Sequence, residues 1–428
     1  MIKIKTEIKK ITTACGEVTV PGDKSISHRA VMLGAIADGT THIKGFLKGA
    51  DCLSTIDCFR KMGIEIDVTD ELITVYGKGL YGLRKPEETL YTGNSGTTTR
   101  LLCGLLSGQD FDTDITGDSS ICKRPMGRVT RPLSLMGAEI ENEYCPLHIK
   151  GRTLCGITYD MTVASAQVKT ALILAGLYAE GETVINETEK SRDHTELMLG
   201  AMGADIEVEG LQIRVGKTDR LIPQDITVPG DISSAAFFLV LGAVMPNSDI
   251  VLKNVGINPT RTGIIDVLLD MGADLEIFNE RVVTGEPTAD IRVRTSNLHG
   301  VKIGGDIIPR LIDEIPAIAV AALYAEGETI IADAKELKVK ETDRIKAVTD
   351  ELKKCGADIT PTDDGMIIVG KKPLHSADFK TYGDHRMAMS LTIAAQLADG
   401  TSTLDNSDCV AVSYPRFFDD LYRLGQGC

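Results

Sequence analysis

Thr19-Val20-Pro21-Gly22-Asp23 and Thr227-Val228-Pro229-Gly230-Asp231 are two copies of one five-residue phrase in a chain of 428 residues. The first copy runs into Lys24-Ser25-Ile26-Ser27-His28-Arg29, which places a cation and hydroxyls at a predicted helix start. The second runs into Ile232-Ser233-Ser234-Ala235, which has no cation. The repeat predicts one structural unit used twice, with chemistry fitted to one copy, and we expect the active site between the halves.

Composition limits the class of protein. A chain of this length is too long for one ordinary core, so two domains are expected, and an apolar content of 43% is typical of a globular protein. No apolar run is long enough to span a membrane, and Met1–Lys5 lacks the apolar stretch of a signal peptide. The formal net charge of −15 argues against nucleic acid as the main partner. Charge for binding an anionic substrate must therefore be concentrated locally.

Cysteine usage points to a reducing compartment. The ten cysteines are scattered, with neither CxxC spacing nor Cys/His clusters. This pattern predicts reduced thiols in the cytoplasm, with neither a disulfide framework nor a zinc site.

A finer repeat divides each half of the chain. Six times a helix-like stretch ends in a glycine, where a helix C-cap favours the left-handed conformation. These glycines are Gly63, Gly137, Gly203, Gly272, Gly356 and Gly425. Three of them precede Thr227 and three follow it, which indicates three similar units in each half.

The repeats predict an α/β fold of two similar lobes. The expected unit is helix, glycine turn, strand, helix, glycine turn, strand, repeated six times. The doubled phrase predicts that the chain crosses between lobes near residues 20 and 228. Residues 1–20 would then join 229–428 in one lobe, 21–228 would form the other, and the active site would lie in the cleft between them.

Cations gather where helices are predicted to start. Capping alone accounts for Ser27, Asp343 and Asp384 taken singly. Lys and Arg are different, because the helix dipole disfavours positive charge at an N-terminus. Six cations sit at or near predicted helix starts: Lys24, Arg29, Arg100, Lys340, Arg344 and Arg386. Together with exposed N–H groups they predict a site for a small, multiply charged anion.

Two acids stand among these cations. Asp313 lies in the apolar stretch Leu311–Pro316, and Glu341 lies between Lys340 and Arg344. Carboxylates near bound anions are candidates for proton transfer. Ion pairing within one helix is the alternative for each of them, and no metal cluster is evident among the seven histidines.

Several motifs together resemble the 5-enolpyruvylshikimate-3-phosphate (EPSP) synthase family of enolpyruvyl transferases, from about residue 15 to about residue 425. The motifs that carry the resemblance are Pro21–Arg29, Gly93–Thr97, Arg124–Met126, Ser165–Gln167, Ser191–Glu196, Val339–Arg344 and Asp384–Ala388. None of them is specific alone, but the combination is.

The resemblance implies both fold and reaction. It implies two lobes of three units each, arranged as an inside-out α/β barrel, that close over the substrates. The implied reaction moves the enolpyruvyl group of phosphoenolpyruvate to the 5-hydroxyl of shikimate 3-phosphate and releases phosphate, on the pathway to chorismate and aromatic amino acids. It also implies a reaction without metal. No cofactor is expected, and we further expect a cytoplasmic monomer with neither nucleic acid nor membrane as a partner.

Matching motif by motif assigns the two ligands. The resemblance implies that phosphoenolpyruvate is bound by Lys24, Asn94, Gly96, Arg124, Gln167, Lys340, Arg344 and Arg386. It implies that shikimate 3-phosphate is bound by Lys24, Ser25, Arg29, Ser165, Ala166, Gln167, Ser191, Arg192, Asp313 and Lys340. Asp313 resembles the base for the attacking hydroxyl. Glu341 resembles a proton-transfer residue at the methylene carbon, and Lys24 is its rival.

The chain departs from parts of the family pattern. Val412 stands where some members carry a lysine, so one contact to phosphoenolpyruvate is missing or replaced. Ala166 stands where others have a second serine, and His194 replaces an aromatic that can stack under the sugar-like ring, so Arg192 could take over a contact. Gly96 leaves room beside phosphoenolpyruvate, which predicts inhibition by the herbicide glyphosate.

Two other functions stay open. A sister enzyme transfers enolpyruvyl to UDP-N-acetylglucosamine and uses a loop cysteine; Cys122 lies two residues before Arg124 but lacks the expected glycine-rich loop. A non-catalytic phosphosugar-binding repeat protein would need the cations but neither Asp313 nor Glu341.

Overall fold

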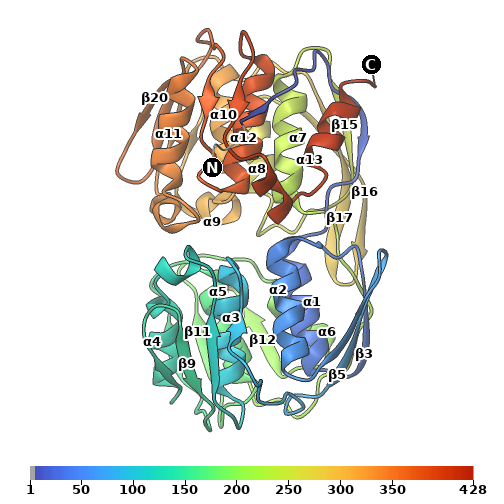
Figure 1. Ribbon diagram of the computed structural model, residues 1–428, viewed down its shortest axis with the longest axis vertical. Helices are drawn as coiled ribbons and strands as arrows, with labels where there is room; N and C mark the ends of the chain where they lie inside the picture. Colours follow the sequence, from blue (N-terminus) through green and yellow to red (C-terminus); the bar gives the residue numbers. More distant parts are fainter. Residues whose placement is uncertain (1–4, 428) are drawn as a thin grey trace. The chain divides into compact units, whose positions relative to one another are not determined.

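The computed structural model describes residues 5–427, which form two compact units (Figure 1). Lobe A comprises the described residues up to Pro21, Pro229–Val282, and the described residues from Pro287 onward. Lobe B comprises Gly22–Val228 and the short segment Val283–Glu286. Pro21 thus falls with lobe A, and a four-residue hairpin tip from the second half of the chain falls with lobe B.

Lobe B contains three four-stranded sheets with their helices. The first unit is α1 (Lys24–Ile36), β3 (Asp38–Lys44), α2 (Ala50–Lys61), β4 (Glu65–Val68) and β5 (Leu72–Lys78). The second is β6 (Leu90–Tyr91), α3 (Gly96–Ser107), β7 (Thr113–Thr116), α4 (Gly127–Leu135), β8 (Glu139–Glu141) and β9 (Leu147–Lys150). The third is β10 (Thr158–Asp160), α5 (Ala166–Gly176), β11 (Thr183–Asn186), α6 (His194–Ala201), β12 (Ile206–Glu209) and β13 (Gln212–Val215), followed by β14 (Ile226–Thr227).

Lobe A repeats this plan. Its first unit is α7 (Ile232–Val244), β15 (Asp249–Gly256), α8 (Gly263–Asp270), β16 (Asp274–Val283) and β17 (Glu286–Arg294). The second is β18 (Lys302–Ile303), α9 (Ile308–Leu311), α10 (Ile315–Tyr324), β19 (Glu328–Ile331), α11 (Arg344–Lys354), β20 (Asp358–Pro361) and β21 (Met366–Val369). The third is β22 (Asp378–Phe379), α12 (His385–Leu397), β23 (Thr403–Leu404) and α13 (Phe417–Leu424).

Each four-stranded sheet has one parallel pair and one antiparallel hairpin. In the first sheet of lobe B the order is β14-β3-β5-β4, with β14 parallel to β3 and the other pairs antiparallel. The predicted unit has two strands, whereas each four-stranded sheet also has the second strand of the hairpin and a parallel edge strand. Several of these additional strands are short, such as β9 and β13 with four residues each and β14 with two, so alternation in the sequence is too brief to mark them.

The last unit of lobe A has no hairpin of its own. Its sheet has the order β1-β23-β22, in which the N-terminal strand β1 (Thr6–Glu7) pairs antiparallel with β23. The start of the chain therefore supplies the strand that a hairpin provides in the other units.

The duplicated phrase marks two of the places where the chain changes lobe; the others flank the hairpin tip Val283–Glu286. The strand β2 (Cys15–Val18) precedes the first copy and pairs in parallel with β15 of lobe A. The strand β14 precedes the second copy and pairs in parallel with β3 of lobe B. Each copy thus follows a strand that stays in the lobe the chain is leaving, and each precedes the first helix of the other lobe.

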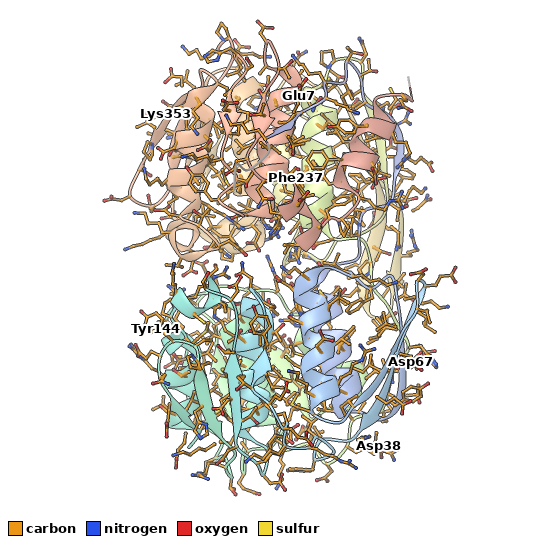
Figure 2. All side chains as sticks on the ribbon, viewed as in Figure 1. Glu7, Asp38, Asp67, Tyr144, Phe237 and Lys353 are labelled. Atoms are coloured by element: carbon orange, nitrogen blue, oxygen red, sulfur yellow. The ribbon has the colours of Figure 1, made fainter. Side chains whose placement is uncertain are left out.

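The core of each lobe is built on helices whose residues are almost all buried. In lobe A these are α7, α10 and α12, and in lobe B α1, α3 and α5. Such helices are stable only when other elements surround them. Phe237 on α7 lies among the helices of lobe A, whereas Asp38, Asp67 and Lys353 lie at the periphery (Figure 2). The buried helices therefore form a rigid base for the residues at their ends.

The glycine turns were largely predicted. Five of the six glycines have positive φ, between +79° and +94°. The expectation was wrong at Gly425, which has φ −67° and a right-handed conformation. A Cβ at Gly425 would lie 2.3 Å from Ile11 Cγ2, so close packing explains this glycine.

Two further expectations concern cysteines and membranes. Eight described cysteines are free thiols, but Cys15 is disulfide-bonded, which corrects the expectation that all thiols are reduced. Within residues 5–427, no helix is both long and apolar enough to cross a lipid bilayer.

Two glycines of α6 and its C-terminal turn allow a matched test of the repeat. Gly203 has φ +79°, so Gly203→Ala should lower the free energy of unfolding by about 1 kcal/mol through backbone strain. Gly200 lies in the helix with open space around it, so Gly200→Ala should raise this free energy by about 0.5–1 kcal/mol. Urea unfolding measures the free energy of unfolding of both variants. Equal changes in this free energy would contradict the left-handed turn assigned to Gly203.

Candidate active site

The start of α1 presents an ion pair. Asp23 caps the helix by accepting a hydrogen bond from Ile26 N at 2.9 Å. Lys24, the first residue of α1, pairs through Nζ with Asp51 near the start of α2, and both side chains are mostly buried. The carboxylate offsets the unfavourable position of a cation at a helix N-terminus.

Arg29 lies one turn further along α1 and is held by neutral acceptors. It donates to Thr195 Oγ1 at 2.7 Å, Thr170 Oγ1 at 2.8 Å and the Ser25 carbonyl at 3.0 Å. Burial lowers the pKa of Arg29 to about 10, so it stays charged at neutral pH. Arg192 donates to Ser25 Oγ at 3.3 Å, which places a second guanidinium beside the same helix start.

The start of α3 gathers two further arginines. Ser95 caps this helix. Arg124 donates to Asn94 Oδ1 at 2.7 Å, and Arg100 donates to Gln167 Oε1 on α5 at 2.9 Å. A Cβ on Gly96 would lie 2.6 Å from Arg100 Nη1 and 3.4 Å from Arg124 Nη1. The absence of a side chain at position 96 is therefore what allows both guanidinium groups to approach.

Two predicted serines have partners inside lobe B. Ser165 caps α5 by accepting from Val168 N, and Ala166 is the first residue of that helix. Ser191 is buried, and both its backbone N–H and its hydroxyl donate to Glu187 Oε1. The Ser191 hydroxyl must leave Glu187 before it can donate a hydrogen bond to a ligand.

A fully buried lysine stands behind Ser191. Lys169 on α5 lies 3.1 Å from Glu187 and 2.7 Å from Glu196, and it donates to the Ser191 carbonyl at 3.2 Å. Removing one partner from such a group leaves an uncompensated buried charge. The charge cluster therefore fixes the loop that carries Ser191 against α5.

Two histidines of lobe B are buried. His194 Nδ1 lies 2.7 Å from Glu286 Oε1 in the hairpin tip, and only 2% of its side chain is exposed. His194 is therefore too buried to offer a face on which the sugar-like ring of the substrate could stack. His28 on α1 lies 2.7 Å from Thr55 Oγ1. Burial and then the charge of Lys24 lower the pKa of His28 to about 3, so this imidazole is neutral at pH 7.

Arg344 is the centre of the cluster in lobe A. It donates to Asp384 at 2.8 Å, to Glu341 at 2.7 Å and to Asp313 at 3.3 Å, and 1% of its side chain is exposed. Burial alone would lower its pKa, but the carboxylates of Asp384, Glu341 and Asp313 raise it above the usual range. Arg344 is thus permanently charged and ties three acids together.

Two more cations hold Asp313 in place. Lys340 Nζ lies 3.1 Å from Asp313 Oδ1, and Arg386 donates to the Asp313 carbonyl at 3.1 Å. Lys340 follows a short 3-10 helix as its C-cap, whereas α11 begins after its N-cap Asp343. The prediction that Lys340 lies at the start of α11 was therefore wrong. The side chain of Asp313 is held from two sides, with 13% of it exposed.

The second copy of the phrase also has a cation, supplied from elsewhere in the chain. Arg261 donates to Asp231 Oδ1 at 3.1 Å and to Ser233 Oγ at 2.7 Å. Ser233 in turn donates to Glu314, which lies 3.6 Å from Arg386. The local sequence of this copy has no cation, and the folded lobe supplies Arg261 from a separate segment.

The predicted site residues form groups within each lobe. Those in lobe B are Lys24, Ser25, Arg29, Asn94, Gly96, Arg124, Ser165, Ala166, Gln167, Ser191 and Arg192. Those in lobe A are Asp313, Lys340, Glu341, Arg344 and Arg386.

Sequence reasoning missed several partners of these groups. Asp51, Glu187 and Glu314 had no motif to mark them. The sequence marks Arg100 as a cation at a helix start but assigns it no role. Asp384 was interpreted as a cap, which it is, but it also holds Arg344. Ser27 is not a cap, because its hydroxyl accepts from Leu47 N. Among the described residues, no group of three or more His, Cys, Asp or Glu side chains could hold a metal ion.

Comparison with known proteins identifies the family. The profile of EPSP synthase (3-phosphoshikimate 1-carboxyvinyltransferase) matches residues 8–421. The chain belongs to the EPSP synthase family. A 3-phosphoshikimate 1-carboxyvinyltransferase of Geobacillus kaustophilus is 58% identical over 97% of this chain and 98% of its own length. That of Brevibacillus brevis is 55% identical over 96% and 97%. The chain is accordingly an enolpyruvyl transferase of the shikimate pathway.

Solved structures agree with this fold. An EPSP synthase from Acinetobacter baumannii has a TM-score of 0.87 and 48% identity, with 98% of each chain covered. The enolpyruvyl transferase NikO from Streptomyces tendae has a TM-score of 0.81 at 19% identity, over 98% of this chain and 97% of its own, and shows the fold alone. The predicted α/β class with two lobes of repeated units is confirmed, as several small sheets rather than a closed barrel.

The neutral His28 of this EPSP synthase family member predicts a pH dependence of stability. The unfolded chain takes up a proton at His28 below about pH 6.5, whereas the folded chain does so only near pH 3. The stability contribution is present above pH 6.5 and is lost as the pH falls, by about 2 kcal/mol between pH 7 and pH 5. In His28→Asn this loss should be absent.

Urea unfolding at both pH values measures the difference. His375→Asn, at an exposed histidine, controls for removing a histidine as such. If the free energy of unfolding fell by the same amount between pH 7 and pH 5 in wild type and in His28→Asn, the neutral state assigned to His28 would be contradicted.

Proposed function

We propose that this enzyme joins phosphoenolpyruvate to shikimate 3-phosphate, and that the cations of lobes A and B hold these two anions. The observation that carries the proposal is the grouping of cations at helix starts, with acids among them, in a chain of formal charge −15. Such local positive charge suits two small ligands that carry phosphate and carboxylate.

The proposed phosphoenolpyruvate contacts are Lys24, Asn94, Gly96, Arg124, Gln167, Lys340, Arg344 and Arg386. The geometry around α3 supports this assignment, because the absence of a side chain at Gly96 lets the guanidinium groups of Arg100 and Arg124 approach the start of the helix. Guanidinium groups bind carboxylate and phosphate through paired hydrogen bonds.

The proposed shikimate 3-phosphate contacts are Lys24, Ser25, Arg29, Ser165, Ala166, Gln167, Ser191, Arg192, Asp313 and Lys340. The contact of Arg192 with Ser25 at 3.3 Å supports a phosphate site at the start of α1. Ala166 would contribute only its backbone N–H, which the helix start leaves available.

Asp313 is the proposed base for the 5-hydroxyl. Lys340 and Arg344 lie 3.1 Å and 3.3 Å from its Oδ1, and most of the side chain is sheltered from water. As the hydroxyl attacks C2 of phosphoenolpyruvate, Asp313 accepts its proton, and the methylene carbon C3 gains a proton from an acid. The product of this step is a tetrahedral adduct, from which phosphate and a C3 proton then leave to restore the vinyl group.

The ion pairs favour different roles for the two candidates at C3. Lys24 contacts Asp51 through Nζ, and its ammonium group carries N–H protons that it can donate. Glu341 accepts a hydrogen bond from Arg344 at 2.7 Å, and its carboxylate has further lone pairs that can accept a proton in the elimination step. We therefore assign the addition proton to Lys24 and the elimination proton to Glu341.

The assignment requires groups of both lobes at the same two ligands, and that requirement stays a prediction. A metal-free reaction, a monomeric state and a cytoplasmic location are parts of the same proposal.

The first test is phosphate release from phosphoenolpyruvate with shikimate 3-phosphate, with UDP-N-acetylglucosamine as the competing acceptor. Asp313→Asn should lower kcat by about 10²–10⁴-fold, because the base is lost, while shikimate 3-phosphate binding by calorimetry stays measurable. Asp306→Asn, at an exposed acid of lobe A, is the control. Turnover with UDP-N-acetylglucosamine instead, or full activity of Asp313→Asn, would overturn the proposal.

The second test concerns Gly96. In Gly96→Ala the new methyl group would lie 2.6 Å from Arg100 Nη1, so the guanidinium must move. We expect the KM for phosphoenolpyruvate to rise and the concentration of glyphosate for half inhibition to rise by more than about tenfold, equivalent to about 1.4 kcal/mol. Gly200→Ala is the control glycine replacement outside the site. Unchanged glyphosate sensitivity of Gly96→Ala would remove Gly96 from the proposed site.

A further inference from the structure

A chain of buried hydrogen bonds runs across the starts of three helices in lobe B. His28 Nδ1 lies 2.7 Å from Thr55 Oγ1, and Thr55 Oγ1 lies 2.8 Å from Thr98 Oγ1. Thr98 Oγ1 donates to Ser95 Oγ at 2.7 Å. None of these four residues is exposed to solvent. The chain thus connects α1, α2 and the cap of α3 without water.

The direction of the protons follows from the last link. Thr55 Oγ1 also lies 3.4 Å from the Asp51 carbonyl, a longer contact than its 2.8 Å contact with Thr98. Because Thr98 uses its single hydroxyl proton on Ser95, the shorter contact needs the proton of Thr55. Thr55 then has none left for His28, so the 2.7 Å contact needs a proton on His28 Nδ1. His28 is therefore the Nδ1–H tautomer of a neutral imidazole, and all three links point toward Ser95.

The members of this chain stand next to the proposed ligand residues. His28 lies one turn after Lys24 on α1, and Thr55 lies one turn after Asp51 on α2. Ser95 is the immediate neighbour of Gly96. A shift of any one helix would lengthen a bond of the chain and move the Lys24–Asp51 pair relative to the start of α3.

We propose that His28, Thr55 and Thr98 are positioning residues that fix the Lys24–Asp51 pair relative to the phosphoenolpyruvate groups on α3. This inference rests on the proposed function. Packing alone does not explain the imidazole, because His28 Nε2 is buried with no hydrogen-bond partner among the described residues. An apolar side chain would avoid that cost, so the Nδ1 donor is what the position requires.

The test compares variants that break the chain with one that preserves a donor. His28→Leu and Thr98→Val remove a link, whereas His28→Asn keeps an N–H donor. We expect the first two to raise the KM for phosphoenolpyruvate by about tenfold or more, with the KM for shikimate 3-phosphate within about twofold of wild type. His28→Asn should stay within about threefold for both.

Thr41→Val is the matched control, since Thr41 is buried in lobe B and its hydroxyl has no partner among the described residues. Thermal unfolding of every variant separates loss of stability from loss of positioning. Equal changes in both KM values, or an Asn variant as impaired as the Leu variant, would overturn the proposal.

A second readout needs no substrate. In protein labelled with ¹⁵N-histidine, the spectrum of His28, assigned by its loss in His28→Asn, should show the neutral Nδ1–H tautomer between pH 5 and pH 8. The Nε2–H tautomer would overturn the network whatever the activity. An Nδ1–H tautomer in a wild-type chain that releases no phosphate would instead overturn the proposed function, and with it the role at phosphoenolpyruvate.

Discussion

Positive charge held at the N-terminal ends of buried helices is the constraint on which the proposed site depends. Helix dipoles disfavour cations there, so each needs a local partner. Lys24 has Asp51, and Arg344 has three carboxylates. Arg29 has hydroxyl and carbonyl oxygens instead. The partners keep the cations charged and in place, so little rearrangement remains when an anion binds, which is the condition for strong electrostatic stabilisation.

The two copies of the duplicated phrase solve the same problem differently. In lobe B the cation Lys24 follows the capping Asp23 directly along the helix. In lobe A the capping Asp231 accepts a hydrogen bond from Arg261, which lies in a separate segment. Ser233 next to this pair donates to Glu314, and Glu314 lies near Arg386. The unit in lobe B therefore has its cation, Lys24, at the helix start. The unit in lobe A uses Arg261 to hold the polar side chains that lead to Arg386.

The glycine turns and apolar helices serve both clusters. Five left-handed glycines end helices sharply, which keeps each unit short enough for three to fit in a lobe. Helices such as α7 and α10 are buried on all sides and cannot shift without disturbing a packed core. The side chains at the starts of these helices, such as Ser233 and Glu314, are therefore held in fixed positions.

The sequence by itself determined the units, most glycine turns, the capping acids and the cations, because these signals lie within a few residues of each other. It also carried enough combined motifs to indicate the family. Tertiary structure alone decided the partners, since pairs such as Lys24–Asp51, Arg261–Asp231 and Arg100–Gln167 join segments far apart in the chain. It also decided that Ser191 turns to Glu187 and that His194 is buried. The physical reason is that hydrogen-bond and ion-pair geometry depends on how helices pack, and local sequence does not encode that distance.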